Sequence, residues 1–174
     1  MATGGDRFVD QVSIKVDRSD LYEGEMISPV IEDAIDAHTL VSCGRSFPDQ
    51  EVRIVATIDQ QLLPELKIGE IYVKGPSVAK GYWNNRVATE ENFDQLVESQ
   101  AGFFRTGDLG FLHQQELYVV GRVKETMKIN GRNIYPQDIE FTVCEAHDSL
   151  RPNSAAAFSI VTDVEERLVI VCEL

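Results

Sequence analysis

Residues 116–140 read ELYVVGRVKETMKINGRNIYPQDIE, and this stretch decides the fold. Residues 116–123 have the alternating side-chain pattern of a β-strand. The Asn-Gly dipeptide at 130–131 favours the positive φ angles of a type I′ turn. Pro136 suits the first position of a helix, and the acidic residues after it suit the positive end of the helix dipole. The stretch therefore predicts a strand, a hairpin and a helix in succession, with a second unit beginning near Gly121.

The flanking segments predict short strands upstream and an apolar pair of strands downstream. In residues 51–58 and 69–75, apolar residues alternate with other residues as in β-strands, and turns with Gly and Pro separate these segments. Residues 89–97 predict a short helix with its N-cap at the first residue. Residues 155–161 and 167–174 are apolar enough to form a sheet covered by the preceding helix. We therefore expect an α+β fold, in which a small antiparallel β-barrel or sandwich subdomain precedes the start of a small α+β C-terminal domain with a hairpin, a helix and strands.

The apolar periodicity also predicts which side chains form the core. Ile58 falls on the inward face of its predicted strand, and Leu117 and Val119 share one face of a later strand. Tyr82 and Trp83 could form a platform for a ligand, but we expect these aromatic rings to belong to the core.

The overall composition excludes several classes of function. The chain has 174 residues with 16 Lys and Arg against 29 Asp and Glu, which gives a net charge of −13. Its mean hydropathy of −0.16 is typical of a soluble chain. Nucleic acid and anionic membrane surfaces are poor partners for so acidic a chain. No apolar run approaches the length of a membrane span, and no signal peptide is evident. The three cysteines have no zinc-ligand spacing, so we expect no metal site and buried free thiols in a reducing cytosol.

The negative charge lies mostly at the two ends of the chain. Residues 1–40 carry nine acidic and three basic side chains, and 137–174 carry eight and two, so each end has a net charge of −6. The middle, 41–136, carries twelve acidic and eleven basic side chains. An anionic ligand such as a nucleotide is therefore repelled least by the middle of the chain.

Three glycine-containing motifs lie in this middle part or extend just beyond it. The first is GEIYVKGPSVAKGYW at 69–83, the second is FRTGDLG at 104–110, and the third extends from Gly121 to Glu140. In this order they resemble the C-terminal part of the adenylate-forming superfamily, which includes acyl-CoA synthetases, luciferases and peptide-synthetase adenylation domains. The segment VSCGR at 41–45 and the acidic stretch before it resemble one family of this superfamily in particular, the fatty acyl-AMP ligases.

This resemblance implies an activity and a set of site residues. Such enzymes use ATP and Mg²⁺ to convert a fatty acid into acyl-AMP, and they pass the acyl group to the phosphopantetheine thiol of an acyl carrier protein. The resemblance implies that Asp108 binds the ribose hydroxyls of ATP and that Arg122 approaches the ribose and phosphates. It places Lys124 at the hinge between the two domains and Gly131 in the loop that approaches the acceptor thiol.

Each of these residues also has a plain structural interpretation. A carboxylate can accept hydrogen bonds from both members of a cis-diol, but Asp108 after a glycine could simply form a turn. Arg122 offers a rigid fork of donors, but it could pair with Glu125 or Asp108 at the surface. Lys124 could be an ordinary solvated lysine, and Gly131 a turn glycine, which does not conflict with its proposed role.

The resemblance further implies that parts of the enzyme lie outside this sequence. We expect 1–40 to be an acidic insertion-like segment, 41–121 to end the large N-terminal domain, and 122–174 to begin the small C-terminal domain. The phosphate-binding loop is absent, and so is the catalytic lysine that the family has near the end of the small domain, since no lysine follows Lys128. We therefore expect an incomplete, inactive fragment with no catalytic residue, which needs the remainder of the large domain. The expected location is the cytoplasm. Two alternatives stay open: a fatty acyl-CoA synthetase with CoA as acceptor, and a non-catalytic adenylation-like binding module.

Overall fold

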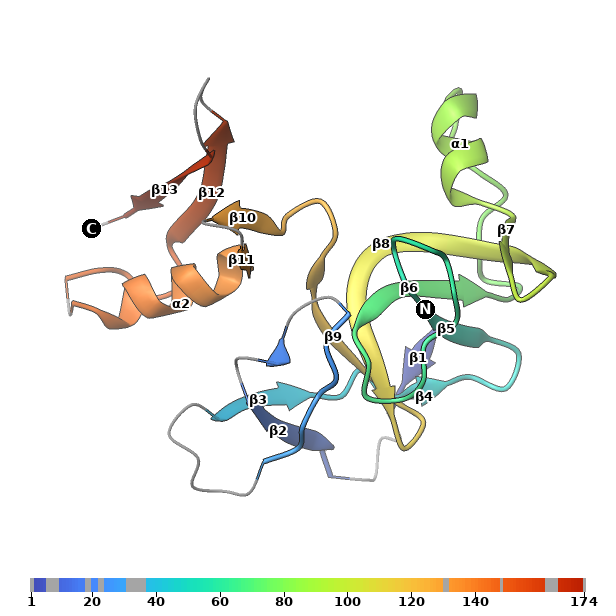
Figure 1. Ribbon diagram of the computed structural model, residues 1–174, viewed down its shortest axis with the longest axis horizontal. Coiled ribbons are helices and arrows are strands. Elements are labelled where there is room, and N and C mark those ends of the chain that lie inside the picture. The colour runs from blue at the N-terminus through green and yellow to red at the C-terminus, as the bar shows by residue number, and fades with distance from the viewer. Residues whose placement is uncertain are drawn as a thin grey trace. The chain divides into compact units, whose positions relative to one another are not determined.

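The computed structural model of the chain contains two compact units, Met1–Val120 and Gly121–Leu174. The first unit holds most of the strands and a short helix, and the second holds two pairs of strands and a longer helix (Figure 1). The residues that the structure describes are 2–5, 10–17, 20–21, 24–30, 37–129, 132–147, 149–161 and 166–173.

The main sheet of the first unit has seven strands in the order β1-β4-β9-β8-β6-β5, with β7 paired to β8 beside this path. Strand β8 is the longest and bends strongly along its length (Figure 1). The strands are β1 (Thr3–Gly4), β4 (Arg45–Ser46), β5 (Glu51–Val55), β6 (Gly69–Lys74), β7 (Gln95–Val97), β8 (Gln100–His113) and β9 (Glu116–Arg122).

The expected α+β class with antiparallel strands is confirmed, and the main sheet is open. A barrel closes when its first and last strands pair with each other. Among the described residues, β1 and β5 stand at opposite ends of the strand order and do not pair. Strand β1 has only two residues, too few to close a barrel. A separate two-stranded sheet is formed by β2 (Ser13–Asp17) and β3 (Ala37–Val41).

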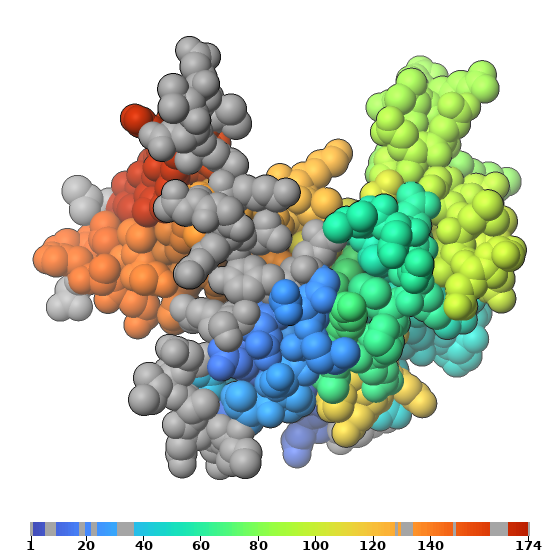
Figure 2. Space-filling view, viewed as in Figure 1, coloured from blue at the N-terminus to red at the C-terminus, as the bar shows by residue number. Residues whose placement is uncertain are grey.

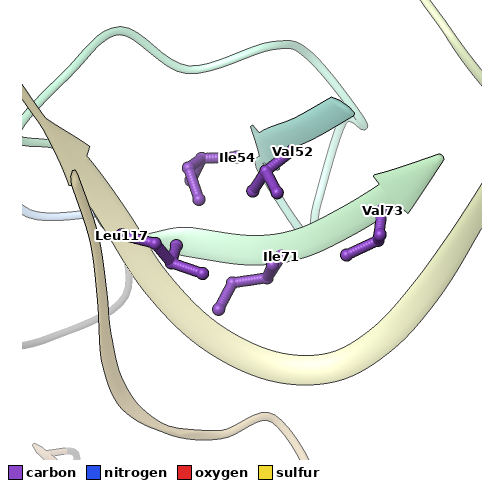
Figure 3. Packing of buried hydrophobic residues seen from close by; sticks show 5 residues of the cluster. All are labelled: Val52, Ile54, Ile71, Val73 and Leu117. Atoms are coloured by element: carbon purple, nitrogen blue, oxygen red, sulfur yellow. The ribbon is translucent and has the colours of Figure 1, made fainter. Parts of the chain in front are cut away.

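The core of the first unit forms where β5, β6 and β9 present their apolar side chains to one another. Figure 3 shows this cluster, which consists of Val52, Ile54, Ile71, Val73 and Leu117. All five are buried, and the four on β5 and β6 follow the two-residue period of a strand. The period of alternation in the sequence therefore predicts the inward face of these two strands correctly.

Ile58 and Val119 do not belong to this core, contrary to expectation. Strand β5 ends at Val55, and Ile58 is 96% exposed. The chain turns there because the side chain of Asp59 accepts a hydrogen bond from the backbone of Gln61, as in an Asx turn. Val119 is 40% exposed, because β9 buries the consecutive residues Leu117 and Tyr118 instead of alternate ones.

The helix predicted at 89–97 begins earlier than expected. Helix α1 spans Arg86–Asn92, and its N-cap is Asn85, whose side chain accepts a hydrogen bond from the backbone of Ala88. The hydroxyl of Thr89 is used differently: it donates to the backbone oxygen of Asn85 and accepts from the backbone of Tyr82. Asparagine caps helices at least as well as threonine, and it stands four residues earlier.

The aromatic pair before α1 lies at the surface, so the prediction that it belongs to the core is wrong. Trp83 is 92% exposed and Tyr82 is 49% exposed. Tyr82 packs edge-on against Phe93, with ring centroids 5.2 Å apart, and this contact leaves the indole uncovered. The segment that carries α1 projects from the surface in Figure 2, and Phe93 at its end packs on Phe104 of β8, with ring centroids 4.6 Å apart.

The second unit contains the predicted strands and helix. Strand β10 (Met127–Ile129) pairs antiparallel with β11 (Arg132–Ile134), and Ile129 stands opposite Arg132. Helix α2 (Pro136–Glu145) has proline at its first turn. Strands β12 (Ala155–Val161) and β13 (Glu166–Cys172) pair over seven positions.

Helix α2 packs on strand β12. The carboxylate of Glu140 accepts a hydrogen bond from the backbone N–H of Ala157, at 2.9 Å. Ala157 is buried, but several apolar side chains of this unit are more than one-third exposed: Phe141, Phe158, Ile160, Leu168, Ile170 and Val171. The helix therefore covers only part of the apolar surface of these strands.

Candidate functional site

Strand β8 bulges where it passes the middle of β6. Between Glu70 and Tyr72 of β6 the register slips, and three residues of β8, 106–108, lie opposite one residue of β6. A bulge of this kind re-aims the side chains of the strand that carries the extra residues. Asp108, the expected ribose ligand, is the last of the three and is half-buried.

The backbone of the bulge is held by its own residues. Gly107 has a φ of +76°, in the left-handed region that glycine adopts most readily. The hydroxyl of Thr106 donates to the backbone oxygen of Ile71 at 2.8 Å and accepts from the backbone N–H of Asp108 at 3.1 Å. One threonine hydroxyl can make both bonds, because it has one donor and two acceptor positions.

An ion pair with a buried carboxylate lies beside the bulge. The carboxylate of Glu70 is 2.7 Å from Nη2 of Arg105, and it also accepts from Nε of that guanidinium at 3.2 and 3.3 Å. The backbone N–H of Gly107 donates to the same carboxylate at 3.2 Å. Glu70 is 2% exposed, and a buried carboxylate is stable only when it is paired in this way. Removing one partner of a buried pair costs about 3–5 kcal/mol.

Two residues beside the bulge, Arg105 and Tyr72, have raised pKa values. The hydrogen bond from Arg105 to Glu70 raises the pKa of the guanidinium above its ordinary value. Burial raises the pKa of the Tyr72 phenol, and attraction to the nearby Arg105 opposes this effect only in part. Both residues therefore keep their ordinary protonation state at neutral pH, with Arg105 charged and Tyr72 neutral.

Arg122 and Lys124 lie in one turn of the second unit. The backbone oxygen of Arg122 accepts hydrogen bonds from the N–H groups of Glu125 and Thr126 and from the hydroxyl of Thr126, at 3.2, 3.2 and 2.9 Å. Lys124 is exposed in the middle of this turn. The turn therefore fixes the backbone around Lys124 through a single carbonyl group.

Arg122 also makes the ion pair that we considered as its plain structural role. Its Nη1 atom is 3.7 Å from Oε1 of Glu125, and the two side chains are 55% and 44% exposed. Exposed pairs of this kind contribute about 0–1 kcal/mol. A ligand phosphate can therefore displace Glu125 from Arg122 at little cost.

Gly131 lies outside the described residues, as does Asn130, although the strands on either side of them are paired. Of the four expected site residues, the structure thus places Asp108 in the first unit and Arg122 and Lys124 together in one turn of the second. Their roles stay predictions.

The described residues contain no group of three or more His, Cys, Asp or Glu side chains that could hold a metal ion. All three cysteines are free thiols, and none of them is buried. The expectation of buried thiols is wrong because Cys43 lies in the exposed loop between β3 and β4, and Cys172 ends the strand β13. No described helix has the length and apolar character needed to cross a membrane.

Two residues that shape the bulge, Glu70 and Thr106, were not singled out from the sequence. Both lie inside motifs that were, GEIYVKGP and FRTGD. The available signal was a single glutamate at the head of the apolar run 71–73, since an isolated acidic residue beside a buried strand calls for a partner.

Comparison with known proteins gives a consistent set of similarities. Residues 23–83 match the family of AMP-binding enzymes. The chain is 42% identical over 151 residues to the medium-chain-fatty-acid–[acyl-carrier-protein] ligase JamA of Moorena producens, a match that covers 86% of the chain and 25% of JamA. It is 46% identical over 117 residues to the putative fatty-acid–CoA ligase FadD21 of Mycobacterium tuberculosis, covering 64% of the chain and 20% of FadD21.

A solved structure from work on fatty acyl-adenylate ligases from E. coli and L. pneumophila is also similar. It matches 99% of the chain and 30% of its own length, with a TM-score of 0.77 and 31% sequence identity. The chain thus spans about a quarter of the length of the curated relatives it matches.

Proposed function

Since the chain belongs to the fatty acyl-AMP ligase family of adenylate-forming enzymes, we propose that it carries the nucleotide-binding edge and the hinge of an ATP-dependent fatty acid ligase. In this proposal 1–40 is an insertion-like segment, 41–121 ends the large domain, and 122–174 begins the small domain. The whole protein would join a fatty acid to AMP and then pass the acyl group to an acyl carrier protein.

The observation that carries this proposal is the bulge at 106–108. A bulge re-aims a side chain and interrupts the pairing of its strand, and bulges are over-represented next to active sites. The bulge lies within the motif FRTGDLG and ends at Asp108. Charge-assisted hydrogen bonds from two ribose hydroxyls to one carboxylate are about twice as strong as neutral ones.

The chain's other residues have supporting roles in the proposed reaction. The fatty acid carboxylate attacks the α-phosphorus of ATP and pyrophosphate leaves, so the nucleotide must be held while charge moves onto the leaving group. Arg122 would hold anionic oxygen atoms of the nucleotide, because its guanidinium stays charged. Lys124 would absorb the backbone rotation between adenylation and thiol transfer, since three hydrogen bonds of its turn end on one carbonyl group, that of Arg122. Gly131 would let the backbone approach the acceptor thiol.

The expected Mg²⁺ has no ligand set in the described part of this chain. We therefore attribute the metal, the phosphate-binding loop and the catalytic lysine to the remainder of the enzyme. It follows that the 174-residue chain alone should catalyse no exchange of pyrophosphate into ATP. Exchange at the rate of the whole enzyme would contradict this part of the proposal.

The proposal predicts that Asp108→Ala in the full-length protein raises KM for ATP strongly. Two charge-assisted hydrogen bonds are lost, each worth about 1.5–3 kcal/mol. The measurement is the steady-state rate of pyrophosphate release at varied ATP, with KM for the fatty acid and the melting temperature as controls. An unchanged KM for ATP would remove Asp108 from the nucleotide site.

The acceptor thiol is the point on which the relatives differ. JamA is named as a ligase for an acyl carrier protein, whereas FadD21 is named as a putative CoA ligase. We favour the carrier protein because the identity to JamA extends over more of the chain. Thiol transfer from the acyl-adenylate to CoA and to a carrier protein should be compared directly, and efficient formation of acyl-CoA would favour a fatty acyl-CoA synthetase.

A failure of the whole protein to exchange pyrophosphate into ATP would favour the other alternative, a non-catalytic adenylation-like binding module.

A further inference from the structure

Among the side chains that the structure describes, Glu70 is the one charged side chain that is buried. The proposed reaction does not use it, and an apolar residue at the same place in β6 would avoid the cost of burying a charge. The position of its partners shows what the charge does. Glu70 stands just before the register slip, and it binds Arg105 just before the bulge and Gly107 in its middle. The carboxylate therefore ties β6 to both the entry and the centre of the bulge.

Thr106 ties the other end of the bulge to the core. Its hydroxyl joins the backbone oxygen of Ile71 to the backbone N–H of Asp108. Ile71 packs in the buried cluster of β5, β6 and β9 (Figure 3). A shift of Asp108 along the strand would therefore have to break a hydrogen bond that is anchored on the rigid centre of the sheet.

We propose that Glu70, Arg105 and Thr106 are positioning residues that hold the bulge at 106–108 in the one shape in which Asp108 meets both ribose hydroxyls of the nucleotide. This inference rests on the proposed function, because it assumes that Asp108 binds the ribose. The three residues do not touch the nucleotide themselves. They act because the carboxylate they support needs a fixed position, and a displacement of about 1 Å can cost as much as 100-fold in rate.

The proposal makes a prediction that general stability does not. A correctly placed Asp108 discriminates ATP from 2′-deoxy-ATP, because the deoxynucleotide lacks one of the two hydrogen bonds. One hydrogen bond to a charged group corresponds to about 10- to 100-fold in kcat/KM. A variant that misplaces Asp108 should lose this ratio, whereas a variant that merely unfolds more easily should lower both rates and keep the ratio.

The first test replaces Thr106 in the full-length protein. Thr106→Val has nearly the same shape but no hydroxyl, so the ratio of kcat/KM for ATP to that for 2′-deoxy-ATP should fall about tenfold. Thr106→Ser keeps the hydroxyl and should restore the ratio. KM for the fatty acid should stay unchanged in both variants. If Thr106→Val keeps the wild-type ratio, Thr106 does not position Asp108.

The second test concerns Glu70, with a matched control. Glu70→Gln keeps the size of the side chain and removes its charge, and it should lower the same ratio about tenfold. The control is Glu116→Gln, because Glu116 forms an ion pair of similar length with Arg45, at 2.8 Å, on the ladder between β4 and β9. This control should keep the wild-type ratio. If Glu70→Gln folds too poorly to assay, the Thr106 variants decide the question.

The third test separates this inference from the proposed function. In an Asp108→Asn background, adding Thr106→Val should cause no further loss of the ratio, because the group being positioned is already impaired. A wild-type ratio near one would show that Asp108 does not bind the ribose, and the proposed function of this site would fail. In another outcome, the wild-type ratio is high and Asp108→Asn removes it, but Thr106→Val and Glu70→Gln both keep it. That outcome would overturn the positioning role and leave the proposed function standing.

Discussion

The two units of the chain bury their apolar side chains to very different extents. The first unit encloses a cluster on β5, β6 and β9 in which every member is at least 91% buried, since the most exposed of them, Val73, is 9% exposed. In the second unit the strands β12 and β13 are just as apolar, but Phe158 and Ile160 are each 44% exposed. Large exposed apolar patches commonly mark a surface that contacts something else.

The contrast shows that apolar sequence and apolar burial are separate properties. Burial contributes about 25 cal/mol for each Å² of apolar surface removed from water, so exposed strands gain little of it. We therefore expect the stability of the chain to reside in the first unit. Amide hydrogen exchange should be slower in β5 and β6 than in β12 and β13, because local opening is easier where few apolar contacts hold a segment.

The largest expected effect comes from truncating matched isoleucines in the two units. Ile54→Ala on β5 should destabilise the first unit by about 2–5 kcal/mol, because Ile54 is 1% exposed and its removal leaves a cavity. Ile160→Ala on β12 should cost less than about 1 kcal/mol, since its side chain is already partly in water. Urea unfolding followed by amide exchange in each unit checks both values. Equal costs would contradict the contrast between the units.

A smaller effect is expected from Glu116, and it should depend on pH. The hydrogen bond from Ser42, at 2.5 Å, lowers the pKa of this carboxyl below its ordinary 4.5, and Arg45 adds to the effect although burial opposes it. A carboxyl with a lowered pKa stabilises the fold above its ordinary pKa, and this contribution is lost as the pH falls below that value.

Glu116→Gln should therefore destabilise the first unit by about 0.5–1 kcal/mol at pH 7 and by progressively less as the pH falls below 4.5. The free energies of unfolding of the wild type and the variant should be compared by urea titration at pH 7 and at several values below pH 4.5. A difference that stays constant over this range would mean that ionisation of Glu116 is not responsible.

The smallest effect is expected in the second unit, at Glu125. Its pair with Arg122 is 3.7 Å long and exposed, so Glu125→Gln should change the unfolding free energy by less than about 0.5 kcal/mol. The same variant removes a competitor for Arg122, so in the full-length protein KM for ATP should fall slightly or stay the same. A destabilisation above 1 kcal/mol, measured by the same urea titration, would show that this pair is structural.

Strand positions and faces were predictable wherever a strict two-residue period held. The alternation placed the apolar residues of β5 and β6 in the core, but it did not predict that β6 also buries Glu70 and Tyr72 on its other face. The buried face of β9 was predicted incorrectly, because Tyr118 stacks on Phe111 on the face that we expected to be exposed, with ring centroids 5.1 Å apart. Which face of a strand has a partner is decided by the neighbouring strands, and a local pattern does not contain them.

The motifs of the candidate site were predictable from the sequence, but its backbone geometry was not. The wording around Asp108 and Arg122 was sufficient for the resemblance, and the family is confirmed. The bulge at 106–108 was not predicted, because it is a mismatch between β6 and β8 and appears only when both strands are paired. Glu70 was overlooked for the same reason, since its partner stands 35 positions away.

The exposed indole before helix α1 has a practical consequence. Trp83 is the single tryptophan of the chain, and it lies 92% in solvent in the native fold. Its fluorescence should therefore resemble that of free indole in water whether the chain is folded or not, and it will report poorly on unfolding. The same property makes it a sensitive probe of contact: a blue-shifted emission in a larger assembly would signal that another surface has covered it.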